Sequence, residues 1–354
     1  MDQILAQYQS SQSKRWVFII LIALMLVLFV LIGTGLGSSR LSLSDSAKAL
    51  LGVGDPTNTG IVWRIRLPRV FAAVMAGMAL AVSGAVMQSL LKNPLGSSST
   101  LGISQAAAFG AAFAVIFLKA GTIQSSSSDA VILNHPQLVS ALAFLFSLIA
   151  ALIILAISKY RGTTPETMVL AGIAIGSLFS AGTTALEYFA DDIQLAAVIF
   201  WTFGDIGRAL WRDFFILAGV TIPACLYFFK NAWNYNALDI GDETAKSLGV
   251  NTVRLRLIGM IVATLATSVA VSLFGIIAFV GLIVPHIIRR VIGGDERFLL
   301  PASALGGGLF LLIADTLART IIAPVVLPVG ILTSFTGAPL FLYLLVKGVR
   351  RKSI

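Results

Sequence analysis

The feature that most constrains the fold is a series of apolar runs, each about 20 residues long, separated by short polar segments. A run of this length crosses the hydrocarbon core of a bilayer as one α-helix. A helix also satisfies its own backbone hydrogen bonds where no water is present. Only 12% of the residues are charged, about half the share found in soluble domains. The sequence therefore predicts an all-α, polytopic bundle of membrane helices that forms a single domain, residues 1–354.

Eight of the runs are separate and clear: 16–36, 68–91, 100–118, 137–157, 167–190, 212–229, 299–318 and 327–346. The stretch 257–288 has 32 residues without Asp, Glu, Lys or Arg, which is too long for one ordinary pass. Basic pairs flank it, at positions 254 and 256 and at positions 289 and 290. Basic residues favour the cytoplasmic side, and two short passes broken near Gly275 keep both pairs there. The prediction is ten transmembrane helices with both termini in the cytoplasm.

The net charge of +9 could indicate nucleic-acid binding, but the basic residues lie in short clusters between the apolar runs. Such clusters set the orientation of a membrane protein. The ten-helix topology places 16 of the 25 Lys and Arg in cytoplasmic segments. The run from Trp16 follows Lys14 and Arg15, and no convincing cleavage site comes after it. We therefore expect a first membrane helix there, an inner-membrane location, membrane lipid as a partner, and no nucleic acid.

Catalytic and metal-binding patterns are missing from the sequence. The phosphate-binding pattern G-x-x-x-x-G-K-[ST] does not occur. The single cysteine, Cys225, can form no internal disulfide, and no metal-ligand spacing is present. We expect no enzyme activity of the chain itself, no cofactor and no metal site, so any energy from ATP would come from a separate subunit.

Small residues recur every four positions at Ala73, Gly77, Ala81 and Ala85, and Gly306–Gly308 lie in a later run. Faces of small residues let helix backbones approach closely in lipid. The pattern predicts close helix packing rather than a substrate path.

The longest polar segment on the predicted cytoplasmic side is 230–256. Within it, Asp239–Leu248 has the marks of a short helix, since Asp239 and Asp242 can cap its start and Gly249 suits a left-handed end. A short helix parallel to the membrane can fit a groove on a soluble partner. An ordinary cytoplasmic loop is the alternative.

Arg66 and Arg69 flank Pro68 at the predicted outer end of the second helix, and proline fits the first turn of a helix. Arginine makes forked hydrogen bonds to carboxylates, so the pair could hold an acidic partner. Anchoring to lipid headgroups explains them equally well from the residues alone. Asp315 and Arg319 are spaced for an i,i+4 ion pair.

Three stretches together resemble a known family: Arg66–Gly96, with the motifs RLPR, ALAVSGAVMQ and KNPLG; Asp242–Val250, DETAKSLGV; and Gly275–Arg289, GIIAFVGLIVPHIIR. In order and spacing they are similar to the iron-siderophore and cobalamin (FecCD-type) permease family. The resemblance covers about residues 16–352, nearly the whole chain.

The resemblance implies the membrane-spanning permease subunit of an ATP-driven ABC importer. Its partners would be a second permease copy or a paralogue, two cytoplasmic ATP-binding subunits and an external solute-binding protein. The cargo would be a bulky metal chelate, a ferric siderophore first, with haem or cobalamin as alternatives. The rival class is a secondary transporter driven by an ion gradient, and a plain channel is a weaker third.

The resemblance also implies roles for individual residues. The binding protein would dock on Arg66, Arg69 and Arg319, whereas Arg64 lies outside the matched motif. Coupling to the ATPase falls on Asp242, Glu243, Ala245, Leu248 and Gly249 within the loop 230–256. The helix 167–190 would line the path, with Thr163, Thr164, Glu166 and Thr167 near its inner gate.

Overall fold

The computed structural model describes residues 2–37, 43–53, 55–120, 135–161 and 164–349, and all regular elements in these ranges are helices. Ten of them coincide with the predicted apolar passes: α1 (Asp2–Gly35), α4 (Leu67–Leu90), α5 (Ile103–Ile116), α6 (Pro136–Arg161), α7 (Pro165–Tyr188), α9 (Trp211–Lys230), α12 (Thr252–Phe274), α13 (Val280–Ile292), α14 (Glu296–Ala318) and α15 (Val329–Val349). The remaining elements are short: α2 (Leu43–Leu50), α3 (Pro56–Ile61), the π-helix η1 (Val62–Arg66), α8 (Asp192–Thr202), α10 (Ala232–Ile240) and α11 (Asp242–Ser247).

By length and composition, seven helical segments among the described residues can cross a membrane. They correspond to α1, the continuous stretch from α3 to α4, α6, α7, α9, α12 and α14. Shorter apolar helices are α5, α8 and the described part of α15. The all-α membrane bundle is therefore confirmed, whereas the number of ten passes stays a prediction.

The predicted break near Gly275 is present. Helix α12 ends at Phe274, Gly275 has φ +78°, and α13 starts after Phe279, which has φ +67°. A Cβ at Gly275 would lie 2.2 Å from the carbonyl oxygen of Trp201. The chain thus turns where only glycine fits both the backbone angles and the space.

Two segments differ from the sequence expectation. The helix of the predicted run 68–91 begins earlier than expected, because α3 and η1 run continuously into α4. Asp55 accepts a hydrogen bond from the backbone N–H of Thr57, and Pro56 occupies the first helical position, so this helix starts earlier. The second addition is α8, which begins with a capping box made by Asp191 and Gln194.

Helix α4 is the centre of the bundle, with almost every side chain buried. Glycines bring it against its neighbours: a Cβ on Gly77 would lie 2.2 Å from the carbonyl oxygen of Gly307 in α14. A Cβ on Gly84 would overlap the carbonyl oxygen of Gly281 in α13. The predicted close packing by small residues is therefore confirmed.

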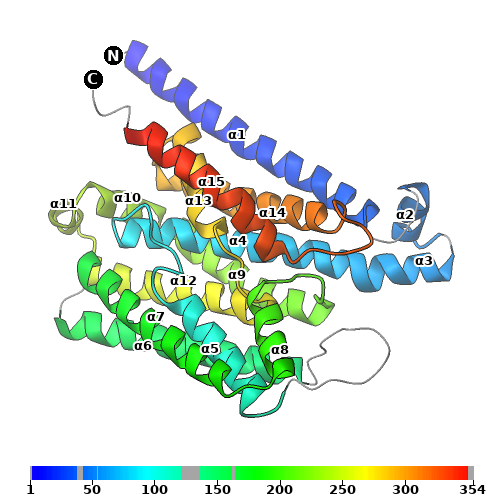
Figure 1. The fold of residues 1–354 in the computed structure, drawn as a ribbon. Helices are drawn as coiled ribbons and strands as arrows, with labels where there is room; N and C mark the ends of the chain where they lie inside the picture. The colour runs from blue at the N-terminus through cyan, green and yellow to red at the C-terminus, as the bar shows by residue number, and fades with distance from the viewer. Residues whose placement is uncertain (1, 38–42, 54, 121–134, 162–163, 350–354) are drawn as a thin grey trace.

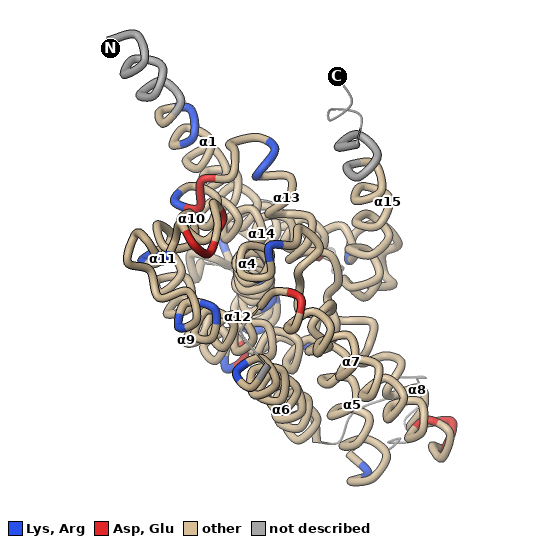
Figure 2. Tube along the Cα trace, turned by 90° about the vertical axis from the view of Figure 1, so that its left-hand side faces the viewer, with Lys and Arg blue, Asp and Glu red and all other residues tan. Residues whose placement is uncertain are grey.

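The two ends of the bundle differ in content (Figure 1). The start of α1 and the end of α15 lie at the same end as α10 and α11, whereas α2, α3 and α8 lie at the other. Charged residues are frequent in α10 and the neighbouring helix ends (Figure 2). This arrangement fits the predicted topology, in which both termini and the segment 230–256 share the cytoplasmic side. We use "inner end" for the end with α10 and α11 and "outer end" for the other.

We expect Gly84→Val to destabilise the bundle, because its side chain would force apart the backbones of α4 and α13. Overpacking of a core costs about 1–3 kcal/mol, and more where backbone must move. Gly219→Val in α9 is the matched control, since a Cβ there meets no atom within 4 Å. Thermal unfolding of the purified chain in detergent should show a lower midpoint for Gly84→Val only. Equal midpoints for the two variants would contradict this account of the core.

Candidate functional site

The polar segment at the inner end forms two helices, α10 and α11, joined at Gly241, where φ is +153°. The prediction of one helix over Asp239–Leu248 is wrong, because the backbone at Gly241 leaves the helical conformation. Asp239 therefore lies in the last turn of α10, and Asp242 is the first residue of α11.

Asp242 fastens α11 to α12 and to the turn that follows α4 instead of capping the N-terminus of α11. Its carboxylate accepts hydrogen bonds from the Arg256 guanidinium at 2.6 and 2.8 Å and pairs with Lys92 Nζ at 2.6 Å. Arg256 is itself buried in α12 and donates to the carbonyl oxygen of Leu90, the last residue of α4. Hydrogen bonds from Arg256 and Lys92 lower the pKa of the Asp242 carboxyl to about 2, although burial acts in the opposite direction. The ion pair is complete above the ordinary pKa of an aspartate and is lost only as the pH falls towards 2.

The other residues predicted to couple to an ATPase divide between an anchored face and an outward face. Ala245 is fully buried, whereas Glu243 is exposed and Leu248 is 65% exposed. Gly249 has φ +82°, and the backbone N–H groups of Gly249 and Val250 donate to the carbonyls of Lys246 and Ala245. The predicted left-handed helix end is confirmed. Helix α11 thus presents an apolar tip beside an acidic side chain.

Helix α10 is also tied to the start of α14. The Asn236 side chain donates to Asp295 at 2.9 Å and accepts from the backbone N–H of Glu296 at 2.8 Å. Asp239, from the last turn of α10, accepts from Ser89 in α4. The α10–α11 unit is therefore attached to the inner ends of α4, α12 and α14, so that a displacement of this unit acts on all three helices.

At the outer end, Arg69 of α4 forms a forked pair with Asp315 of α14, with Nη2 at 2.8 Å and Nε at 3.0 Å. Arg319 donates to the carbonyl oxygen of Gly33 in α1 at 2.7 Å and lies 3.5 Å from Asp315. The predicted i,i+4 pair is present. Sequence spacing could not reveal the Arg69 pair, because its partners are 246 residues apart.

Arg66 completes this set of arginines by donating to the carbonyl oxygens of Thr34 and Gly35, at 3.0 and 2.7 Å. All three arginines are buried, with 3%, 8% and 3% exposure for Arg66, Arg69 and Arg319. They join α1, α4 and α14 beneath the outer surface. Arg64, which the family motif does not include, is exposed at the same end.

The residues expected at the inner gate lie at the start of α7. Thr164 caps the helix by accepting a hydrogen bond from the backbone N–H of Thr167, and their hydroxyls are 3.0 Å apart. Glu166 is exposed in the first turn, and Thr163 lies outside the described residues. Most of α7 is uncovered: of its residues only Met168, Ala171, Gly172 and Gly176 are buried. The prediction that this helix faces a path stays untested, but the helix has a large free apolar face.

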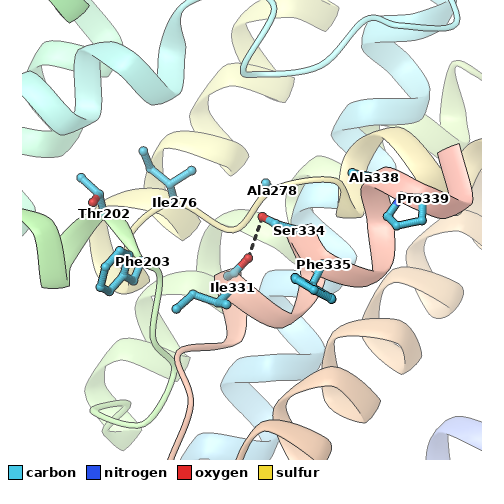
Figure 3. A pocket seen from close by; sticks show the side chains of 10 residues that line it. Thr202, Phe203, Ile276, Ala278, Ile331, Ser334, Phe335, Ala338 and Pro339 are labelled. Carbon is cyan, nitrogen blue, oxygen red and sulfur yellow. Dashed lines mark hydrogen bonds between the residues drawn. The ribbon is translucent and has the colours of Figure 1, made fainter. Parts of the chain in front are cut away.

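A cavity of about 510 Å³ lies where the break between α12 and α13 meets α15 (Figure 3). Ile276 and Ala278 come from the break, Phe203 follows α8, and Phe335 projects from α15 (Figure 3). Ser334 donates to the carbonyl oxygen of Gly330 at 2.8 Å, so its hydroxyl is satisfied within α15. The walls are almost wholly apolar. Sequence analysis missed this site, since it depends on three segments that only the fold brings together.

Comparison with known proteins places these features in a family. The FecCD transport family model matches residues 24–347. An ABC transporter permease protein of Methanocaldococcus jannaschii is 54% identical, over 98% of both chains. The hemin transport system permease protein of Yersinia pestis is 38% identical, over 94% of this chain and 97% of its own.

A solved structure described as an inward-facing conformation of a metal-chelate type ABC transporter has a TM-score of 0.80 at 28% identity. The match covers 93% of this chain and 98% of the other. The family implies ATP-binding subunits, a partner permease and a solute-binding protein as its assembly. The chain belongs to the FecCD transport family and is a multi-pass permease subunit of an ABC transporter.

Proposed function

We propose that this permease carries a bulky metal chelate inward across the cytoplasmic membrane, driven by ATP hydrolysis on two separate cytoplasmic subunits. A ferric siderophore is the first candidate, and haem and cobalamin are the alternatives. The single observation that carries the proposal is the α10–α11 unit, which combines an exposed tip with attachments to the inner ends of three long helices. Haem as the cargo of one relative and the metal-chelate class of the structural neighbour support the substrate class.

The mechanism follows from these attachments. A soluble ATPase that binds Leu248 and Glu243 would contact a helix that is rigidly attached to the bundle. Asp242 and Ala245 hold the opposite face of α11 in place. When the ATPase subunits move on binding or hydrolysing ATP, the α10–α11 unit moves with them and tilts α4, α12 and α14 together. A concerted tilt of long helices changes which end of a central path is open.

The path itself needs a second permease, either another copy or a paralogue. Helices α7 and α15 lie on one side of the bundle, with α9 on the other (Figure 2). Leu170, Leu178 and Phe335 on this side are 67%, 66% and 82% exposed. A facing subunit would cover this apolar surface, and the apolar walls of the cavity beside α15 would suit a bulky chelate. Thr164, Glu166 and Thr167 would then stand near the inner opening.

At the outer end we propose docking of a solute-binding protein. Arg66, Arg69 and Arg319 hold the helix ends that form this surface. A direct pair with a carboxylate of the binding protein would require Arg69 to exchange Asp315 for the incoming group.

A secondary transporter remains the rival, and the interruption between α12 and α13 suits either class, because broken helices also occur in ion-coupled carriers. The attached α10–α11 unit favours the ABC importer, since a carrier driven by an ion gradient needs no docking site for a cytoplasmic ATPase.

We expect the reconstituted chain to transport nothing when an ion gradient is its sole energy source. Liposomes that contain the chain alone should take up no radiolabelled ferric siderophore or haem under a proton or sodium gradient. Liposomes that also contain the cognate ATPase and binding protein should take up substrate when ATP is present. Robust uptake without the ATPase would overturn the proposal.

We expect Gly249→Val to weaken ATPase coupling, because a β-branched residue is strained at φ +82°. Ser247→Val is the matched control, since it places the same side chain on exposed, helical backbone of α11. In the purified complex, Gly249→Val should reduce ligand-stimulated ATP hydrolysis several-fold, and Ser247→Val should leave it near the native rate. Identical rates for the two variants would remove α11 from the coupling path.

Docking can be tested by separating Arg69 from its internal partner. We expect Arg69→Gln to lower affinity for the binding protein at least tenfold, about 1.4 kcal/mol. Asp315→Asn removes the competing carboxylate and should leave the affinity equal or higher. Affinity is measured on the detergent-solubilised complex at two salt concentrations, with basal ATPase activity as the check of folding. An equal loss of affinity in both variants would mean that Arg69 only holds α4 and α14 together and does not contact the binding protein.

A further inference from the structure

A second cavity, of about 430 Å³, lies near the outer end between α6 and α9, both of which pack against α12. We propose that it binds an anionic phospholipid, with the phosphate held by Arg208 and Arg212 and a hydrocarbon chain lying along the groove. We call it the α6–α9 groove. Its volume lies within the range of about 300–1,000 Å³ that is typical of small-molecule sites.

The walls and the mouth of the groove have different chemistry. Phe144 of α6, Ile216 of α9, and Val269 and Leu273 of α12 make the walls apolar. Arg208, Arg212 and Asp213 lie where α9 begins. An apolar slot with cationic groups at one end matches the two parts of an anionic phospholipid.

The mouth lies at the depth where a headgroup would lie. Trp211 is the first residue of α9, and its Nε1 donates to the carbonyl oxygen of Trp63 at 2.8 Å. Tryptophan is enriched at the interface between the hydrocarbon core and the headgroups. Arg212 follows it directly, so its guanidinium can reach a lipid phosphate while the groove below extends towards the hydrocarbon.

The backbone next to Arg208 is fixed by the short segment between α8 and α9, whereas the side chains of Arg208 and Arg212 are exposed. The backbone N–H of Asp205 donates to the carbonyl oxygen of Phe274 at 2.7 Å, and Ile206 is fully buried. No side-chain hydrogen bond or ion pair is found for Arg208 or Arg212 within the described residues. This contrasts with Arg69 nearby, which has Asp315.

The acidic groups near the mouth accept hydrogen bonds from the backbone and form no ion pair within 4 Å with Arg208 or Arg212 among the described residues. Asp213 accepts a hydrogen bond from the backbone N–H of Leu210 at 2.9 Å, which fixes it at the start of α9. The Asp205 carboxylate accepts from the backbone N–H of Gly207 at 2.7 Å and also faces Arg69. Partial burial lowers the pKa of the Arg208 guanidinium, while the charges of Asp205 and Asp213 raise it. A phosphate would supply the missing counter-charge and bind bidentately to guanidinium.

The groove is lined by α6, α9 and α12, and none of its lining residues comes from α7 or α15. Helices α7 and α15, whose side the second permease would cover, lie on the opposite side of the bundle from α9 (Figure 2). Lipid is what surrounds a membrane helix that no subunit covers. A free phosphate ion would use the arginines but leave the apolar walls unexplained.

The test measures lipid binding to the full-length chain in detergent by native mass spectrometry, with phosphatidylglycerol and phosphatidylcholine added in equal amounts. We expect the native chain to retain phosphatidylglycerol at least fivefold better. Arg208→Gln with Arg212→Gln should bring the ratio close to one. Arg64→Gln, which removes an exposed arginine of the same end outside the groove, should keep the native ratio.

Two further arms distinguish the source of the phosphate and guard against misfolding. Inorganic phosphate at millimolar concentration should not displace the lipid; displacement would mean that a free anion is the ligand and would overturn the proposal. A photoactivatable phosphatidylglycerol should cross-link the native chain within 136–144 or 208–216. Cross-links confined to other segments, or an unchanged lipid ratio in the double variant, would also overturn it.

Discussion

The close approach of α4 to α13 and α14 is the constraint on which the rest of the structure depends. Gly77 and Gly84 let backbone meet backbone, and the space for a side chain is absent at both positions. In lipid the hydrophobic effect gives little reason for helices to associate, so packing of this kind must supply the attraction. Because α4 is buried along its length, its two ends are fixed points for the polar groups at each membrane surface.

The position of α4 determines which of those polar groups can contact one another. At the outer end Arg69 reaches Asp315 because Gly77 and Gly307 have already brought α4 and α14 together. At the inner end Ser89 of α4 meets α10, and Lys92, in the turn that follows α4, meets α11. A buried ion pair such as Arg69–Asp315 adds little net stability by itself, but removing one partner leaves a buried charge. It therefore specifies the register between α4 and α14 more than it drives their association.

The sequence predicted those features that depend on local pattern. Apolar length located the helices, the basic pairs located the break at Gly275, and Gly249 was correctly placed in a left-handed helix end. It missed features that depend on contact between distant segments. Asp242 looks like a helix cap in sequence, yet Arg256 and Lys92 are its partners once α4 and α12 converge. The cavity beside α15 and the α6–α9 groove are each formed by segments that are far apart in the sequence, so no local pattern could predict them.

The arginines at the outer end show how burial separates roles that sequence treats alike. Arg66, Arg69 and Arg319 each have backbone or carboxylate partners inside the chain, and their exposure is small. Arg208 and Arg212 are near the same surface but border an apolar groove. A guanidinium with partners inside the protein stabilises the helices that it joins, whereas one without a hydrogen-bond partner attracts an anion from its surroundings. In a membrane protein, the anion most abundant at that depth is the phosphate of a lipid headgroup. The same residue type therefore serves internal architecture in α4 and contact with the bilayer at the start of α9.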